Sequence, residues 1–185
     1  TRNGINYFDS NAKSFITFRN DPQDKASMSS NYVLSICRDY IGDLWIGTGD
    51  GLNLFNRPMD YFIQFKHDPK NPKSLSDNQV TCIYEDSSGL LILGTYHGGL
   101  NLFDRRSNSF TTYQHNPENE NSLSNNRVHC IQSAGSGLLW IGTDDGLNLF
   151  DRRKESFIRY NHDPQNPNSL SNNSVYCIYT DHTRK

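Results

Sequence analysis

The residues of this 185-residue chain that could perform chemistry are its thiols, imidazoles and carboxylates, and most of them recur at one place in a repeated pattern. Cys82, Cys130 and Cys177 stand in VTCI, VHCI and VYCI. Such thiols could form a disulfide or bind a metal, but equivalent strands of neighbouring repeats usually hold the sulfur atoms beyond disulfide reach, and no CxxC spacing indicates a metal. We therefore interpret these cysteines as small apolar side chains of a repeated core.

Three of the six histidines also recur at one place, directly before an Asx-Pro pair: His67, His115 and His162. A catalytic acid or base is a single group placed at a single reacting atom. A residue that is copied into every repeat is poorly suited to that task. The pattern favours a role in loop structure over catalysis or metal binding.

Most of the acidic residues are also copied among the repeats, and they lie mainly in turns. The repeated ones are Asp39 and Asp86, and Asp104 and Asp151. A glycoside hydrolase would need two carboxylates at a suitable separation across a cleft. Asp50, Asp144 and Asp145 are exceptions to the copying, and turn chemistry also explains them. We expect no catalytic residue, no metal site and no cofactor.

Two stretches of the chain are written several times over, and they define a repeat. One stretch reads LWIGTGDGLNLF (44–55), LILGTYHGGLNLF (91–103) and LWIGTDDGLNLF (139–150). Equivalent positions are 47, 48 and 47 residues apart: Ile5, Leu52, Leu100 and Leu147. A fixed period in this range indicates a repeat architecture.

Each repeat contains four short runs of β-branched and aromatic residues with turn residues between them. In the third repeat the runs are NRVHCIQ (126–132), LLWIGT (138–143), GLNLFDR (146–152) and SFIRYNH (156–162). Gly-containing turns that suit tight hairpins join the first three runs, and no sustained helical period of apolar residues occurs. Each repeat is therefore expected to be a four-stranded antiparallel meander.

A longer segment connects one repeat to the next, as in SFTTYQHNPENENSLSNNRV (109–128). One long crossover per four-stranded meander is typical of a β-propeller, in which the chain travels from the outer edge of one blade to the innermost strand of the next. Prolines keep such a segment extended. Its Ser and Asn side chains can bond to nearby backbone groups that no strand satisfies.

The sequence thus predicts an all-β chain of propeller blades of about 47 residues each, cut from a longer array. The expected divisions are a partial blade with outer strands and crossover, three whole blades, and the innermost strand of a further blade: 1–30, 31–77, 78–125, 126–172 and 173–185.

The LWIGT run carries the strongest core signal. Trp45 and Trp140, with Ile92 in the equivalent place, are expected to pack between adjacent blades rather than to stack on a ligand. The glycines of the same run allow close backbone approach. These are Gly47, Gly94 and Gly142.

Charge and hydropathy exclude several classes of partner. The net charge is -2 and the pI is about 6.3, which provides no electrostatic footprint for nucleic acid at this segment. No apolar run approaches the roughly 18 residues that a membrane-spanning helix needs. Any membrane attachment is therefore expected through a helix elsewhere in a longer parent protein.

At these residues the chain resembles the two-component regulator propeller repeat, through the combined pattern LWIGT, GLNLFD and SFxxYxHDPxNPxSLS over essentially its whole length. The resemblance implies a seven-bladed propeller in the periplasmic sensor region of a bacterial hybrid two-component system. In such a system propellers precede a β-sandwich, a membrane helix, a histidine kinase and a receiver. It also implies a sensor that detects carbohydrate.

The chain departs from the repeat pattern at a few positions. Ile92 replaces the usual tryptophan, and Glu120 replaces a proline. Ala134 stands where the other repeats have an aspartate, at Asp39, Asp86 and Asp181. These changes alter individual blades and not the family resemblance.

Comparison among the repeats also indicates where a ligand could bind, because positions that agree serve the blade and exposed positions that differ are free to serve a ligand. The residues that flank the first valine of the innermost strand differ most, and they are expected to ring the mouth of the central channel. They include Tyr32, Gln79 and Arg127 before the valine, and Thr81, His129 and Tyr176 after it. The second repeat adds Tyr96 and His97 in a hairpin that opens on the same face. Mixed aromatic and polar groups suit a sugar; the alternative is neutral drift near solvent.

Three functions follow as hypotheses. The first is a non-catalytic propeller segment that senses an oligosaccharide and relays its binding to a histidine kinase. The second is a scaffold for protein interaction or self-association through the blades. The third is a propeller glycoside hydrolase or lyase, which the copied carboxylates disfavour.

Overall fold

The computed structural model describes residues 2–181, which form β-strands joined by turns and crossovers and contain no helix. An N-terminal hairpin consists of β1 (Ile5–Asp9) and β2 (Ser14–Phe18). The first whole sheet consists of β3 (Val33–Arg38), β4 (Leu44–Thr48), β5 (Gly51–Asn56) and β6 (Tyr61–Phe65). The second consists of β7 (Val80–Glu85), β8 (Leu91–Thr95), β9 (Leu100–Asp104) and β10 (Ser109–Tyr113). The third consists of β11 (Val128–Gly135), β12 (Leu138–Thr143), β13 (Gly146–Asp151) and β14 (Ser156–Tyr160).

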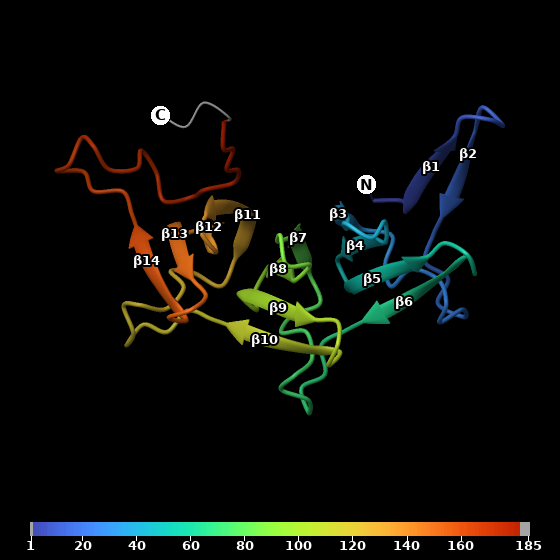
Figure 1. The fold of residues 1–185 in the computed structure, drawn as a ribbon, viewed down its shortest axis with the longest axis horizontal. Helices are drawn as coiled ribbons and strands as arrows, with labels where there is room; N and C mark the ends of the chain where they lie inside the picture. The colour runs from blue at the N-terminus through green and yellow to red at the C-terminus, as the bar shows by residue number, and fades with distance from the viewer. Residues whose placement is uncertain (1, 182–185) are drawn as a thin grey trace.

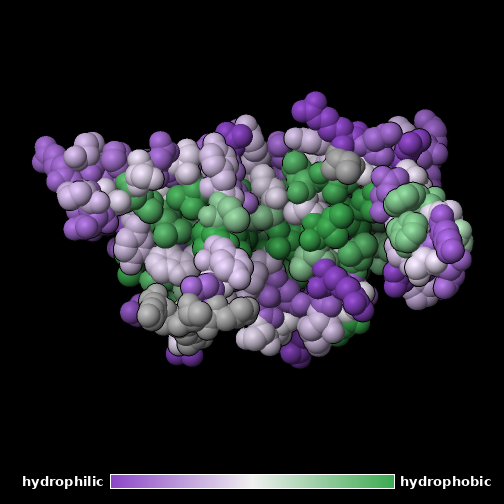
Figure 2. All heavy atoms as spheres, turned by 90° about the horizontal axis from the view of Figure 1, so that it is seen from above, coloured by the Kyte–Doolittle hydropathy of each residue, from purple (hydrophilic) through white to green (hydrophobic). Residues whose placement is uncertain are grey.

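The three whole sheets are the predicted blades, each an antiparallel meander in chain order. The innermost strands β3, β7 and β11 lie side by side, and the sheets fan out from them into an open arc (Figure 1). Seen from above, the concave side shows apolar residues in a band between polar rims (Figure 2). The all-β propeller prediction is confirmed for these sheets.

The prediction of a further innermost strand over 173–185 is wrong for residues 174–181, which form no strand. A strand needs a partner for its backbone groups, and this chain has no fourth LWIGT run to pair with them. The segment still docks as an innermost strand would: Val175 N donates to Thr143 O at 2.9 Å, and the Cys130 thiol lies 3.7 Å from Val175 O. The rest of the prediction, 182–185, lies outside the described residues.

Core packing between blades occurs for Trp45 and Ile92, as the LWIGT run predicted, but not for Trp140. Trp45 is buried against Leu93 and Phe103 of the second blade. Ile92 is buried among residues of the third blade. Trp140 is half-buried and contacts Tyr160 of its own blade, with 5.6 Å between ring centroids.

The repeated glycines permit this packing because the next innermost strand passes directly over them. A Cβ at Gly47 would lie 2.7 Å from Val80 O, and one at Gly94 would lie 2.6 Å from Val128 Cγ1. At Gly142 the corresponding atom is Val175 O, at 2.6 Å. The same contact is thus made at three successive junctions, which places Val175 in a blade-like position.

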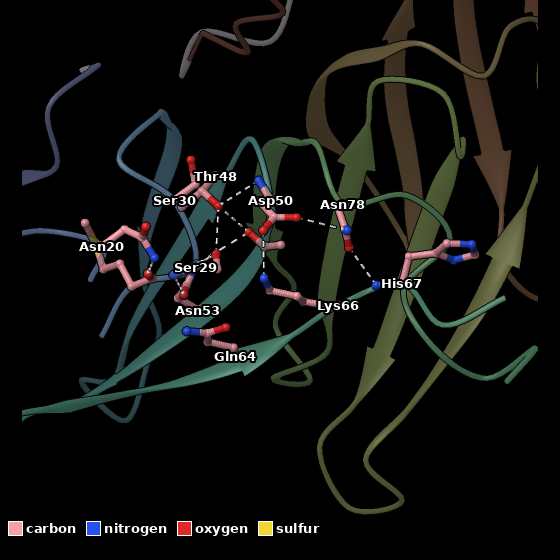
Figure 3. Close-up of polar contacts among 12 residues, drawn as sticks. Asn20, Ser29, Ser30, Thr48, Asp50, Asn53, Gln64, Lys66, His67 and Asn78 are labelled. Carbon is pink, nitrogen blue, oxygen red and sulfur yellow. Dashed lines mark hydrogen bonds and ion pairs between the residues drawn. The ribbon is translucent and has the colours of Figure 1, made fainter. Parts of the chain in front are cut away.

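The crossovers are fixed to the blades by a buried polar network, drawn for the first blade in Figure 3. Asn53 Nδ2 donates to Ser29 Oγ at 2.8 Å, and the Ser29 and Thr48 hydroxyls are 2.9 Å apart. Ser124, Thr143 and Asn148 repeat the arrangement in the third blade. The crossover thus contributes the serine and the blade contributes the asparagine, while a crossover asparagine, Asn78, accepts from His67 N at 2.6 Å.

The recurring histidines belong to the same loop structure, as expected. The Nδ1 atoms of His67, His115 and His162 lie 2.7, 2.9 and 2.6 Å from the carbonyl oxygen of a leucine eight residues later. Cys37, Cys82, Cys130 and Cys177 are free thiols in this structure.

Candidate functional site

The variable positions before each innermost strand lie beside the second hairpin of the same blade. Gly49 N donates to Tyr32 O at 2.8 Å, and Tyr96 N donates to Gln79 O at 3.0 Å. Asp144 N donates to Arg127 O at 3.2 Å. The two sets of variable residues therefore meet at one end of the blades, as the sequence predicted.

At this end the structure forms a connected group of side chains, which we call the channel-mouth cluster: Tyr96, Arg127, His129, Asp144 and Tyr176. The Arg127 guanidinium lies 3.9 Å from the centroid of the Tyr96 ring. Arg127 Nη1 donates to Asp144 Oδ2 at 3.0 Å, and His129 Nε2 lies 2.6 Å from Asp144 Oδ1. The His129 and Tyr176 rings are in contact, with centroids 4.6 Å apart.

Asp144 is the centre of the cluster and holds its two basic partners in place. Burial alone would raise the pKa of Asp144, but hydrogen bonds from His129 and Arg127 outweigh burial and lower the pKa. The carboxylate therefore stays ionised at neutral pH. It orients a guanidinium and an imidazole that are themselves only partly buried, with side-chain exposures of 38% and 12%.

The cluster spans two blades and the docked segment that follows them. Tyr96 belongs to the second blade, Arg127, His129 and Asp144 belong to the third, and Tyr176 lies on the segment that docks after it. Tyr176 is 69% exposed, so most of its surface remains available. Aromatic surface beside charged and hydrogen-bonding groups can bind a ligand that has both C–H faces and hydroxyls.

The other predicted site residues make contacts outside the charged centre of the cluster. His97 packs edge-on against Tyr96, with centroids 4.5 Å apart, and its backbone N donates to Asp77. The Thr81 hydroxyl donates to Val128 O at 2.6 Å, so it serves the contact between blades. Tyr32 and Gln79 contribute the backbone carbonyls described above, and Tyr32 lies on the first blade, away from Asp144.

Sequence reasoning missed Asp144, which it explained as a turn residue together with Asp50 and Asp145. Asp50 does have a structural role, since it bonds Lys66 Nζ at 2.7 Å and Asn78 Nδ2 at 3.1 Å (Figure 3). Asp145 repeats that role through Asn173 Nδ2 at 2.8 Å.

The signal that could have identified Asp144 was present in the repeats. Asp144 occupies the hairpin position held by Gly49 and Tyr96, which differs in every blade, and not the position shared by Asp50 and Asp145. Positions that differ among the blades therefore mark candidate ligand residues in this hairpin as well as in the innermost strand.

A cluster of metal ligands and a membrane-spanning helix are both absent from the described part of the chain. Among residues 2–181 no group of three His, Cys, Asp or Glu side chains could hold a metal ion. The same residues contain no helix that is long and apolar enough to cross a membrane.

Comparison with protein families decides the identity of the repeats. The model of the two-component regulator propeller matches residues 27–50, 74–97 and 122–145. The chain carries two-component regulator propeller repeats. Each matched segment runs from the end of a crossover to the second hairpin of a blade, so these repeats include every member of the channel-mouth cluster except Tyr176.

Solved structures agree with this assignment. The extracellular domain of the hybrid two-component system BT3049 of B. thetaiotaomicron is 31% identical, with a TM-score of 0.72 over 81% of this chain and 21% of that chain. The corresponding domain of BT4673 from the same organism is 21% identical, with a TM-score of 0.79 over 98% of this chain and 23% of that one. PorZ, a surface component of the type-IX secretion system of Porphyromonas gingivalis, is 17% identical, with a TM-score of 0.57 over 82% of this chain and 21% of that chain.

The last two similarities show the fold alone. The chain spans about a fifth of the length of each of these proteins. No curated protein sequence matches the chain.

Proposed function

We propose that this chain is a non-catalytic, ligand-sensing propeller segment in the periplasmic region of a transmembrane hybrid two-component sensor. It recognises an oligosaccharide and relays the binding to a histidine kinase of the same protein. The regulator propeller repeats support this proposal, as does the similarity to the extracellular domain of BT3049, itself described as part of a hybrid two-component system.

The observation that carries the sensing role is the channel-mouth cluster. Positions that agree among the blades are engaged in blade structure, whereas the differing residues Arg127, His129 and Asp144 converge on one another. A sugar presents C–H faces that pack on aromatic rings and hydroxyls that need donors and acceptors. Tyr176 offers the first, and the three polar side chains offer the second.

The same contacts favour binding over catalysis. A glycoside hydrolase needs one carboxyl group that is protonated and able to donate. Asp144 instead has a lowered pKa between Arg127 and His129, and the neighbouring Asp145 accepts from Asn173. These carboxylates are committed to holding side chains in place.

The test is calorimetric titration of the intact periplasmic region with a panel of oligosaccharides, beside an Arg127→Ala/His129→Ala double variant. Saturable binding that the variant loses, without turnover of the sugar, is the expected result. Binding retained by the variant would move the site to other blades. Turnover by the wild-type protein would replace the sensing role with an enzymatic one.

The N-terminal hairpin favours a second candidate, an interaction scaffold. Phe8 and Phe15 are 52% and 69% exposed, whereas the equivalent pair Phe103 and Phe110 is buried under Phe65 of the preceding blade. Another blade, or a second copy of the protein, could cover the exposed pair. A scaffold would bind no oligosaccharide, and its sedimentation coefficient would rise with protein concentration.

A further inference from the structure

A charged contact locks the first blade to the second at the end opposite the channel mouth. Arg105 Nη1 lies 2.8 Å from Asp39 Oδ2, and its Nη2 lies 3.1 Å from Glu85 Oε1. Trp45 Nε1 also donates to Asp39 Oδ2 at 2.8 Å, and the Arg105 guanidinium lies 5.3 Å from the Trp45 ring. The Asp39 side chain is fully buried. We call this aspartate–arginine pair a latch.

The second and third blades are locked by an equivalent latch. Asp86 occupies the position of Asp39, and Arg152 occupies that of Arg105. Arg152 Nη1 forms an ion pair with Asp86 Oδ2, and the Asp86 side chain is only 9% exposed. An ion pair of this kind is costly to break because it leaves a buried charge without its partner.

The third junction is different, because the third blade has Ala134 at the latch position. A methyl group accepts no hydrogen bond and carries no charge, whatever the next blade presents to it. In each latch the earlier blade of the junction supplies the aspartate. The junction between the third blade and the docked segment Ser174–Tyr176 has Ala134 in that place and therefore cannot form a latch.

The channel-mouth cluster crosses this same junction. His129 contacts the Tyr176 ring, and Ser174 Oγ lies 3.5 Å from Asp144 O. On its other side the cluster crosses a latched junction, where Arg127 covers Tyr96. One half of the site is thus fixed and the other half lies on a junction without a latch.

We propose that the junction at Ala134 is the joint that ligand binding closes, and that its closure is the first step of the relay. This rests on the proposed function of the cluster as a ligand site. A ligand that touches Tyr176 and the Arg127–Asp144–His129 group at once binds the closed arrangement better than an open one. Differential affinity of this kind shifts the population towards the closed arrangement.

Two native thiols report on the two junctions separately. Cys82 packs in the core between the second and third blades, and Cys130 lies against Val175 at the joint. Burial raises the pKa of Cys82 to about 12 and that of Cys130 to about 11. Since the thiolate is the reactive form and burial disfavours it, opening of a junction should speed the labelling of its thiol.

The experiment measures the native-state labelling rate of each cysteine in the intact protein with a thiol reagent, resolved by mass spectrometry of peptides. The lower pKa of Cys130 alone should make it react about tenfold faster than Cys82. A junction without a latch should add about a further tenfold or more, because a hydrogen-bonded charge pair contributes at least that factor. Arg152→Ala should raise the Cys82 rate by a similar factor. Arg153→Ala is the matched control and should leave both rates unchanged. A Cys130 rate only about tenfold above that of Cys82, which the pKa difference alone explains, would overturn the joint.

The second arm repeats the labelling with each oligosaccharide that binds in calorimetry. Binding should slow the labelling of Cys130 several-fold and leave Cys82 unchanged. An oligosaccharide that binds and does not slow Cys130 would overturn the relay. If no oligosaccharide binds, the proposed function fails, while the comparison of Cys130 with Cys82 in the free protein still decides whether the joint exists.

Discussion

Two adjacent aspartates in the third blade make different contacts. Asp145 repeats Asp50 and holds an asparagine of the following crossover. Asp144 has no acidic counterpart and holds Arg127 and His129. The two side chains are neighbours in sequence, yet each belongs to a different network.

Substituting each aspartate separately distinguishes the two networks. Asp144→Ala should weaken oligosaccharide binding by about tenfold or more, since it releases two orienting contacts to charged or polar partners. Asp145→Ala should retain binding and lower the free energy of unfolding by about 1 kcal/mol through loss of its hydrogen bond. Calorimetric titration and urea unfolding check the pair. Equal loss of binding in both variants would contradict the division of roles.

Gly47 allows a prediction at the same scale. Gly47→Ala would place a Cβ 2.2 Å from Ser35 Oγ and 2.7 Å from the Val80 carbonyl oxygen, and the latter cannot move without shifting the next blade. The expected loss of unfolding free energy is about 3 kcal/mol, as for other overpacked cores.

Gly49→Ala is the matched control for this overpacking. Its Cβ would meet the Tyr32 ring at 3.0 Å, and that side chain is 41% exposed and able to move. The cost should stay below about 1 kcal/mol. Urea unfolding followed by tryptophan fluorescence measures both variants, and equal losses would show that close blade approach is not what Gly47 provides.

At the scale of the element, each blade is stabilised by side-chain packing against the blades on either side of it. Phe18, Phe65 and Tyr113 each pack on the aromatic pair of the following blade. Each latch adds a charged contact between two blades. Its aspartate lies in the hairpin between the first two strands of one blade, and its arginine lies in the hairpin between the last two strands of the next blade. Blade-to-blade junctions are therefore the units whose strength differs along the chain.

The first latch provides a direct measure of one junction. Arg105→Ala removes the partner of a fully buried Asp39 and should lower the free energy of unfolding by about 3 kcal/mol. Arg106→Ala removes a neighbouring arginine of the same turn and should change it by less than about 0.5 kcal/mol. Equal values in urea unfolding would show that Arg105 contributes no more than an ordinary surface charge.

The latches also predict how stability depends on pH. Burial would raise the pKa of Asp39, but the hydrogen bonds from Trp45 and the Asp43 backbone, together with the charge of Arg105, lower it below 3.8. Burial would also raise the pKa of Asp86, but the Ser88 and Leu90 hydrogen bonds and the charge of Arg152 outweigh it and lower the pKa. Carboxylates with lowered folded-state pKa values contribute stability above their unfolded pKa of about 4, and this is lost as the pH falls below it.

Urea unfolding at a series of pH values tests this dependence. The free energy of unfolding should be nearly constant from about pH 7 to pH 5 and should fall below about pH 4. Arg105→Ala should fall less steeply, because the pKa of its Asp39 is no longer lowered by the arginine. A free energy that rises on acidification would contradict the assignment.

At the scale of the whole molecule, the repeat predicts the architecture because its signals are local. The period, the Gly-containing hairpins and the long crossovers predict a meander per repeat, and the LWIGT run predicts which side chains lie between blades. Confirmed examples are Trp45, Ile92 and the glycines beneath the next strand.

Features that depend on contacts across blades could not be predicted in the same way. The Asp39–Arg105 latch joins residues from hairpins of different blades, and nothing in either hairpin alone indicates its partner. The contacts of Asp144 with His129 and Arg127 likewise could not be read from its hairpin alone, although its variable hairpin position was a signal in the sequence. The segment 174–181 has the sequence of a strand, but strand formation depends on a partner strand that the chain does not contain.

Binding through a cluster that spans two blades and the docked segment is the central claim, and Tyr176 tests it most directly. The measurement is calorimetric titration of the intact protein that contains this segment with the tightest oligosaccharide of the panel, for Tyr176→Ala and for Tyr179→Ala. Both tyrosines are exposed on the same segment, at 69% and 80%, but only the Tyr176 ring is in contact with His129. The account predicts that Tyr176→Ala weakens binding by about tenfold, the value of one aromatic contact, while Tyr179→Ala binds as the wild type. Unchanged binding by Tyr176→Ala would contradict it.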